Sequence, residues 1–140
     1  MMVFYCKYYA KKEKDRQSMV THLRDKAHRM LEQADLMITM GQWDLAVNRY
    51  YYACFHSLQA LFVSTGLSAH THAGTSTVFG QHFVKTGLAD VSLGRFFATM
   101  VQLRQKTDYN SVVNITEEDA RDIVEQSHFF VEKVEELLSL

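Results

Sequence analysis

The sequence of 140 residues contains no proline and only six glycines. Because proline interrupts helices and both residues mark turns, their scarcity disfavours a turn-rich all-β fold and favours long helices with short connections. The two cysteines, Cys6 and Cys54, are too few for a disulfide framework or a cysteine-only metal site. No stretch reaches about 18 uncharged apolar residues, so no membrane span is predicted. We expect one domain, with the reducing cytoplasm as the default compartment.

Charge is nearly balanced overall but unevenly distributed along the chain. The formal net charge is −1, with Lys and Arg in excess over residues 1–30 and Asp and Glu in excess over residues 116–140. A protein coated in nucleic acid carries a much larger positive charge. We therefore predict no DNA binding, and basic character is confined to a local patch near the N-terminus.

Apolar residues recur at spacings of three and four along most of the chain, which is typical of amphipathic helices. We predict helices over about residues 18–40, 43–65, 75–86, 92–108 and 116–138. Gly41 is suited to a left-handed C-cap after the first of them, and Gly66 and Gly87 mark the ends of the second and third. Thr116 and Asp119 have the spacing of a loose capping box. The predicted fold is an all-α, antiparallel bundle of four to five helices.

Residues 1–18 are expected to be an N-terminal extension of a domain that spans residues 19–140. The extension carries aromatic and basic side chains that could stack on and pair with nucleic acid. They are Phe4, Tyr5, Lys7, Tyr8, Tyr9, Lys11 and Lys12. A helical extension without such a role is the simpler interpretation, and we prefer it.

The stretch 43–65 is apolar nearly all round, which predicts a helix buried among the others. Arg49 and His56 lie two helical turns apart on one face, with Tyr52 between them. They must reach a cleft, an interface or a buried partner. A cation beside an imidazole suits metal-independent RNA cleavage, in which a base takes the 2′-hydroxyl proton. The alternative, favoured by residue type alone, is a core histidine beside an arginine whose head reaches solvent.

A second polar group occurs in the sequence LRQKTDY. Arg104 falls within the apolar stripe of Phe97 and Met100, so it should face the interior or a groove. Asp108 follows one turn later, the spacing of an ion pair. Taken alone, this spacing favours a structural pair that closes the helix.

Two histidines, His70 and His72, stand one residue apart in the sequence SAHTHAG. Such a pair can ligate a metal, but a third ligand at a suitable spacing is missing. We predict a turn that caps the following helix, and no metal site.

The stretch NRYYYACFHSLQALFVSTG resembles the signature helix of the HEPN domain family (higher eukaryotes and prokaryotes nucleotide-binding). The similarity continues in the same order to an acidic last helix and covers about residues 20–138. Its further parts are His72-Ala73-Gly74, the FVKTGL of residues 83–88, Gly94-Arg95 and Arg104-x-x-x-Asp108-Tyr109. The chain is most similar to the small stand-alone bacterial and archaeal members.

The resemblance implies a helical bundle that usually forms a homodimer. Many members are encoded beside a minimal nucleotidyltransferase and act as toxin with antitoxin. Active members are metal-independent RNases whose Arg-x4–6-His motifs meet across the dimer. Arg49 and His56 fit this spacing literally, but in a helix where the pattern looks structural. At the position used by the toxins the chain has Arg104 followed by Asp108 and Tyr109, with no histidine before residue 128.

Two functional hypotheses follow. The first is a non-catalytic module that binds RNA, a nucleotide or a nucleotidyltransferase partner, with no cofactor; the missing histidine favours it. The second is a toxin-like, metal-independent RNase, with Arg49, His56 and Arg104 as catalytic residues. Both place the site in one polar cleft near the two-fold axis of a homodimer. The expected ligand-binding residues are Arg49, Tyr52, His56, Arg104, Asp108 and Tyr109.

Overall fold

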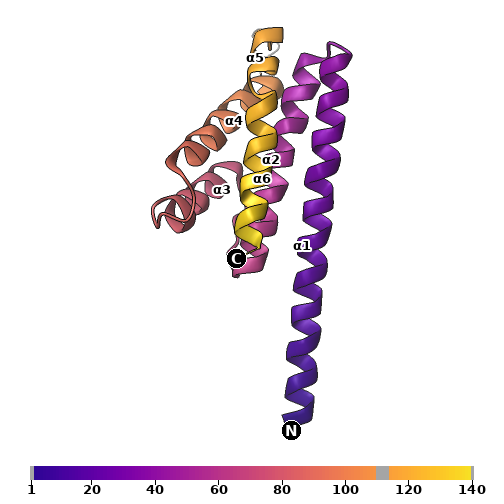
Figure 1. Cartoon of the computed structure of the whole chain (residues 1–140), viewed down its shortest axis with the longest axis vertical. Coiled ribbons are helices and arrows are strands. Elements are labelled where there is room, and N and C mark those ends of the chain that lie inside the picture. Colours follow the sequence, from indigo (N-terminus) through magenta and orange to yellow (C-terminus); the bar gives the residue numbers. More distant parts are fainter. Residues whose placement is uncertain (1, 110–113, 140) are drawn as a thin grey trace.

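Four long helices run alternately up and down beside one another in the computed structural model (Figure 1). The structure describes the backbone of residues 2–109 and 114–139 and the side chains of residues 12–108 and 114–139. No strand occurs within these backbone ranges, and the all-α prediction is confirmed. The elements are α1 (Met2–Thr39), α2 (Trp43–Thr65), α3 (His72–Phe79), the π-helical turn η1 (Gly80–Val84), α4 (Val91–Tyr109), α5 (Glu117–Asp122) and α6 (Val124–Leu138).

Helix α2 is the central element of the bundle. It packs against α1, α3, α4, α5 and α6, and its buried residues include the adjacent pairs Tyr50–Tyr51, Ala53–Cys54, Ser57–Leu58 and Ala60–Leu61. Adjacent buried positions cannot all lie on one helical face, so α2 is enclosed on more than one side. This confirms the central position predicted for residues 43–65.

Helix α1 is longer than the sequence pattern predicted, because it begins at Met2 rather than near residue 18. Residues 2–18 contain neither glycine nor proline and include many good helix formers, so nothing interrupts the helix. The N-terminal half of α1 projects beyond the other helices in Figure 1. The side chains of residues 12–19 are exposed, which explains why no apolar stripe marked this part of the helix. The aromatic side chains of residues 1–11 lie outside the described side chains.

Two further elements differ from the predicted ranges. The predicted helix over residues 75–86 begins earlier, at His72, and changes to a π-helical turn that the Lys85 N–H closes on the Gly80 carbonyl at 2.8 Å. The predicted helix over 116–138 is divided at Ile123 into α5 and α6. A one-residue break leaves the apolar residues on both sides facing the core, so the periodicity does not reveal it. The capping box of Thr116 and Asp119 is confirmed.

Aromatic rings from α2, α3, η1, α4 and α6 form a continuous series through the core. The Tyr51 ring stacks on Phe97 at a centroid distance of 5.8 Å, and Phe97 stacks on Phe130 at 5.9 Å. The series continues through Phe79 and Phe83 and returns to α2 at Phe62. Each such ring pair adds about 0.5–1.5 kcal/mol beyond its area burial. The series fixes α4 and α6 against α2.

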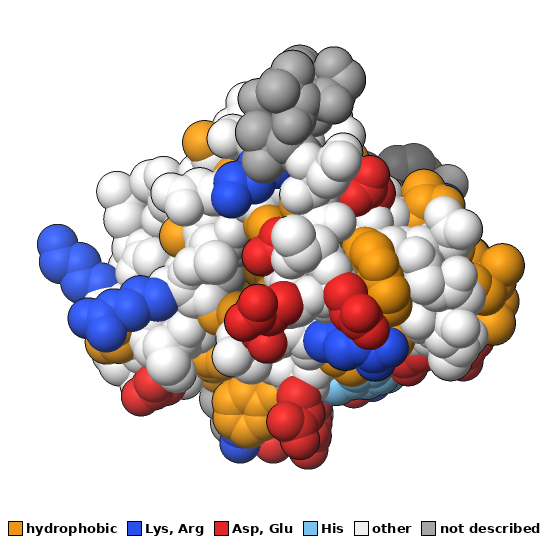
Figure 2. Space-filling view, turned by 90° about the horizontal axis from the view of Figure 1, so that it is seen from above, with side chains coloured by type: hydrophobic (Ala, Val, Ile, Leu, Met, Phe, Trp, Pro, Cys, Tyr) orange, Lys and Arg blue, Asp and Glu red, His pale blue; other side chains and the backbone are white. Residues whose placement is uncertain are grey.

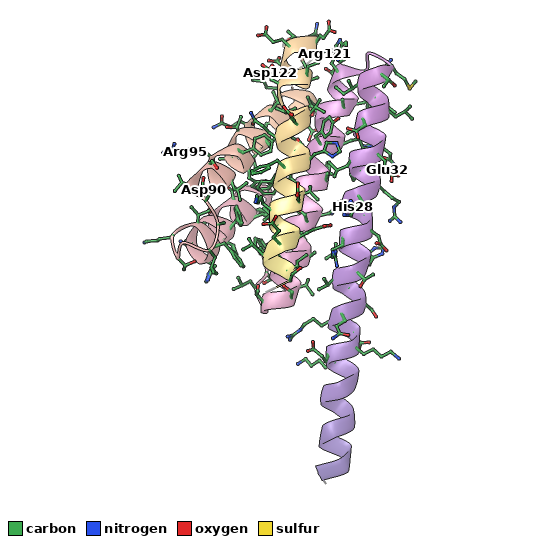
Figure 3. All side chains as sticks on the ribbon, viewed as in Figure 1. His28, Glu32, Asp90, Arg95, Arg121 and Asp122 are labelled. Carbon is green, nitrogen blue, oxygen red and sulfur yellow. The ribbon has the colours of Figure 1, made fainter. Side chains whose placement is uncertain are left out.

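Polar side chains join α1 to α6 across the outer face of the bundle. His28, labelled on α1 in Figure 3, hydrogen-bonds to Glu135 of α6. His128 of α6 bonds to Asp35 of α1 at 2.9 Å, and the Tyr50 hydroxyl of α2 donates to the same carboxylate at 2.5 Å. These bonds hold three helices in register at the surface. Within the described residues, no helix combines the length and apolarity needed to cross a membrane.

Two glycines allow a test of how α2 ends. Gly66 has a left-handed φ of 76°, whereas Gly80 is right-handed with a φ of −59°, and a Cβ at either position would meet no atom within 4 Å. Gly66→Ala should lower the free energy of unfolding by roughly 1–2 kcal/mol, because an L-residue is strained in this conformation. Gly80→Ala should raise it by about 0.4–1 kcal/mol, because it restricts the unfolded chain. Urea unfolding measures both; equal effects would contradict the assigned C-cap.

Candidate functional site

Arg104 of α4 lies over two tyrosine rings of α2. Its guanidinium carbon is 5.4 Å from the ring centroid of Tyr51 and 5.4 Å from that of Tyr52. The Arg104 side chain is only 14% exposed, which confirms that it faces inward from the apolar stripe of α4. Each cation–π contact is worth from about 0.5 kcal/mol to about 2 kcal/mol where water is excluded. The rings therefore fix the position of a largely buried positive charge.

Asp108 lies one helical turn from Arg104 and partly neutralises it. The Nη2 atom of Arg104 is 2.6 Å from Oδ2 of Asp108, so the predicted ion pair is confirmed. The Nε atom of Arg104 is buried and has no hydrogen-bond partner within the described part of the chain. A guanidinium carries five N–H donors, and here the carboxylate does not satisfy all of them. The side chain is 14% exposed, so the other guanidinium hydrogens, and not the enclosed Nε–H, are those that an acceptor such as a phosphate oxygen could reach.

Tyr51 and His72 join this group, although neither was among the residues predicted for the site. The fully buried Tyr51 hydrogen-bonds through its hydroxyl to Nδ1 of His72. His72 is the first residue of α3, where Thr71 forms the N-cap by accepting from the Gly74 N–H at 2.8 Å. This confirms the turn that was predicted to cap the helix. The His72 ring also lies 5.2 Å from that of Phe55.

The chain therefore has a histidine beside Arg104 that its linear spacing concealed. His72 precedes Arg104 by more than thirty residues, and the two are brought together only because α3 and α4 both pack on α2. No sequence period connects the two positions. We call Tyr51, Tyr52, His72, Arg104 and Asp108 the Arg104 cluster.

Burial and charge set the protonation of the Arg104 cluster. The pKa of His72 is lowered, first by burial and then by the Arg104 cation, while Asp108 opposes the shift. The pKa of Tyr51 is raised by burial, although Arg104 opposes this. At neutral pH His72 is therefore an uncharged imidazole and Tyr51 retains its phenolic proton.

His56 adjoins the cluster through Tyr52 but lies towards α1. Its ring centroid is 5.8 Å from that of Tyr52. The pKa of His56 is lowered to about 4, mainly by burial and in smaller part by the nearby Lys26 and His22 of α1. His56 is consequently neutral at pH 7 and a weak proton acceptor.

The remaining predicted residues are placed as follows. The Nε of Arg49 donates to Oε1 of Gln33 on α1 at 2.9 Å, and its Nη1 donates to Oδ1 of Asn48 at 3.0 Å. The structure thus brings Tyr52, Arg104 and Asp108 together, with His56 beside Tyr52, and directs Arg49 to α1. Tyr109 is the last residue of α4, and its side chain lies outside the described part of the structure. Among the described residues, no three His, Cys, Asp or Glu side chains are grouped as metal ligands.

The fold is an antiparallel helical bundle in which Arg104 of α4 faces inward onto α2. The model of the HEPN domain family matches residues 20–137, and the chain belongs to this family. It is 32% identical over 124 residues to a UPF0332 protein of Thermotoga maritima, covering 89% of this chain and 94% of the relative. It is also 33% identical over 125 residues to a protein of Methanocaldococcus jannaschii named a putative toxin, covering 89% and 92%. A second putative toxin of that organism is 29% identical, covering 83% and 79%.

The lowered pKa of His56 predicts a dependence of stability on pH. As pH falls from about 6.5 towards about 4, the unfolded chain binds a proton at His56 that the folded chain does not, so stability is lost. His56→Gln removes this contribution, and the free energy of unfolding should fall less steeply over that range. His82→Gln, at an exposed histidine, is the control. Urea midpoints between pH 4 and 7 measure the slopes; identical slopes for wild type and His56→Gln would contradict the shift.

Proposed function

We propose that this HEPN protein binds single-stranded RNA or a nucleotide through a phosphate held at Arg104. The observation that carries the proposal is the buried Arg104 guanidinium, fixed over Tyr51 and Tyr52 and incompletely satisfied by Asp108. Guanidinium binds phosphate oxygens in a bidentate manner and stays charged at any working pH. Tyr52 and Phe55 are partly exposed beside it, and aromatic rings offer stacking surfaces to bases.

Binding without efficient cleavage agrees best with the surrounding chemistry. A general base works best when its pKa is close to the operating pH, whereas the pKa of His56 is about 4. The names of two relatives as putative toxins favour the second candidate, a metal-independent RNase with Arg49, His56 and Arg104 as catalytic residues. The two candidates differ in whether bound RNA is degraded.

Two kinds of partner complete the proposal. One is a minimal nucleotidyltransferase that forms a two-gene toxin–antitoxin system with this protein in the cytoplasm. The other is a second copy of the chain. Among the described side chains, seven large apolar ones are about half exposed, including Leu88, Val91 and Phe129, and burial of such surface drives association. In a homodimer, the shared site would include the polar residues Arg49, Tyr52, His56, Arg104, Asp108 and Tyr109.

Arg104→Ala should weaken binding of a labelled single-stranded RNA by roughly 10- to 100-fold, the equivalent of about 1.5–3 kcal/mol for charged hydrogen bonds. Arg121→Ala is the matched control. Arg121, labelled in Figure 3, also forms a one-turn ion pair, with Glu117 at 2.8 Å, and also lies over an aromatic ring, that of Trp43. Its end of the bundle is rich in acidic side chains (Figure 2), so its loss should not reduce affinity. Fluorescence anisotropy measures each Kd.

Equal affinities of wild type and Arg104→Ala would contradict the proposed phosphate site. The same RNA, incubated for hours with wild-type protein and a chelator, should remain intact. Degradation that His56→Ala abolishes would establish the nuclease instead. Urea unfolding of each variant separates a lost contact from a lost fold.

A homodimer should appear in sedimentation equilibrium as a species of about twice the 16.2 kDa chain mass at micromolar concentration. The physical reason is the exposed apolar surface, which a dimer would cover. A single species of the chain mass over the whole concentration range would contradict the dimer and leave the proposal for Arg104 in place.

A further inference from the structure

We propose that Tyr51 holds His72 in the tautomer whose Nε2 carries the hydrogen, so that His72 acts beside Arg104 as a neutral hydrogen-bond donor to the phosphate of bound RNA. The inference rests on the proposed function and adds to it a second ligand-binding residue, His72, and a positioning residue, Tyr51. Neither residue belongs to the set that the sequence predicted.

The tautomer follows from the burial of the Tyr51 hydroxyl. A phenol can donate to Nδ1 of a histidine or accept from it. Tyr51 is 0% exposed, and within the described residues its hydroxyl has no hydrogen-bond partner besides His72. If the hydroxyl accepted from Nδ1, its own hydrogen would be buried without an acceptor, which costs about 1–3 kcal/mol. The phenol therefore donates to Nδ1, and the hydrogen of the neutral ring is on Nε2.

Burial and the neighbouring Arg104 favour the neutral form of the His72 ring. Among the described side chains, the titratable and charged groups that face it are Tyr51 and Tyr52 from α2 and Arg104 and Asp108 from α4. Helix α3 itself contains no other ionisable residue. Because burial and Arg104 outweigh Asp108, the pKa of His72 lies below its ordinary value.

A neutral Nε2–H has a definite chemical consequence. It can donate to a phosphate oxygen that also accepts from Arg104, but it cannot accept a 2′-hydroxyl proton while Tyr51 occupies Nδ1. The positive charge of Arg104 is offset by Asp108 at 2.6 Å, and His72 adds none. Such a site suits the single negative charge of a phosphodiester better than the two charges of a terminal phosphate. The charge balance accordingly favours an internal phosphodiester, which under the proposed function belongs to single-stranded RNA.

The chain contains a matched pair of side chains for the test. Tyr50 is also fully buried on α2, and its hydroxyl donates to Asp35. His128 packs against the Tyr50 ring at 6.2 Å, as His72 packs against Tyr51. This second tyrosine–histidine pair belongs to the α1–α6 contact and lies outside the Arg104 cluster. Tyr50→Phe and His128→Ala therefore reproduce the structural loss without touching the proposed site.

The tautomer is measured by two-bond proton–nitrogen NMR on labelled full-length protein. We expect the His72 ring of the wild type to be neutral at pH 7, with the hydrogen on Nε2. In Tyr51→Phe the ring should become a mixture of the two tautomers. An imidazolium at pH 7, or a hydrogen on Nδ1 in the wild type, would overturn the proposal.

Binding of a short single-stranded RNA gives the functional measurement. We expect His72→Ala to weaken it about tenfold, and His72→Gln, which keeps a neutral donor, to restore most of the loss. The Kd of Tyr51→Phe should lie between those of His72→Ala and His72→Gln. Tyr50→Phe and His128→Ala should leave the Kd unchanged. The wild-type Kd should be constant between pH 6.5 and 8, because no group in contact with the phosphate changes charge. A dinucleoside monophosphate should compete better than a 5′-mononucleotide.

The outcomes separate this inference from the proposed function. If Arg104→Ala abolishes binding and His72→Ala does not alter it, the phosphate site stands and the role of His72 is refuted. Affinity that rises steadily as the pH falls below 8, or better competition by the mononucleotide, would also refute it. If Arg104→Ala has no effect, the proposed function itself fails.

Discussion

The contact that the rest of this structure depends on is the one between the Tyr51 ring and its neighbours. One face of the ring continues into the aromatic series through Phe97 and Phe130, which holds α4 and α6 against α2. Another side supports the Arg104 guanidinium, and the hydroxyl binds His72. One side chain thus couples the packing of the core to the arrangement of the polar cluster.

The polar groups on α2 divide into two environments. Towards α1, Arg49 bonds to Gln33 and His56 lies near Lys26 and His22. Towards α4, Tyr52 shares the Arg104 cation with Tyr51. The division follows from the helical geometry of α2, since Arg49 and His56 lie only about 20° apart around the helix, whereas Tyr52 lies further round, on the side of α4. Tyr52 stands at the boundary and contacts both groups.

Local pattern was sufficient for most of the fold. The stripes of apolar residues predicted the long helices, and the glycines at positions 41, 66 and 87 all adopt positive φ. The capping box at Thr116 was predicted because it depends on residues three apart. The pattern did not predict the start of α1, because that part of the helix is exposed and has no apolar stripe. It also did not predict the break at Ile123, because the apolar stripe continues across the break. Periodicity shows which face of a helix is buried, so it detects neither an exposed helical extension nor a break that leaves the buried face unchanged.

By itself the sequence determined the class of fold, the central position of α2, the inward position of Arg104 and its pairing with Asp108. Each of these depends on residues within a few turns of one helix, so spacing carries the information. Only the tertiary structure decided which residues meet Arg104. Tyr51 was one of many apolar positions on α2, and His72 belonged to a separate turn. They became partners because α3 and α4 pack on the same side of α2, a juxtaposition that arises from packing between helices and has no counterpart in linear spacing.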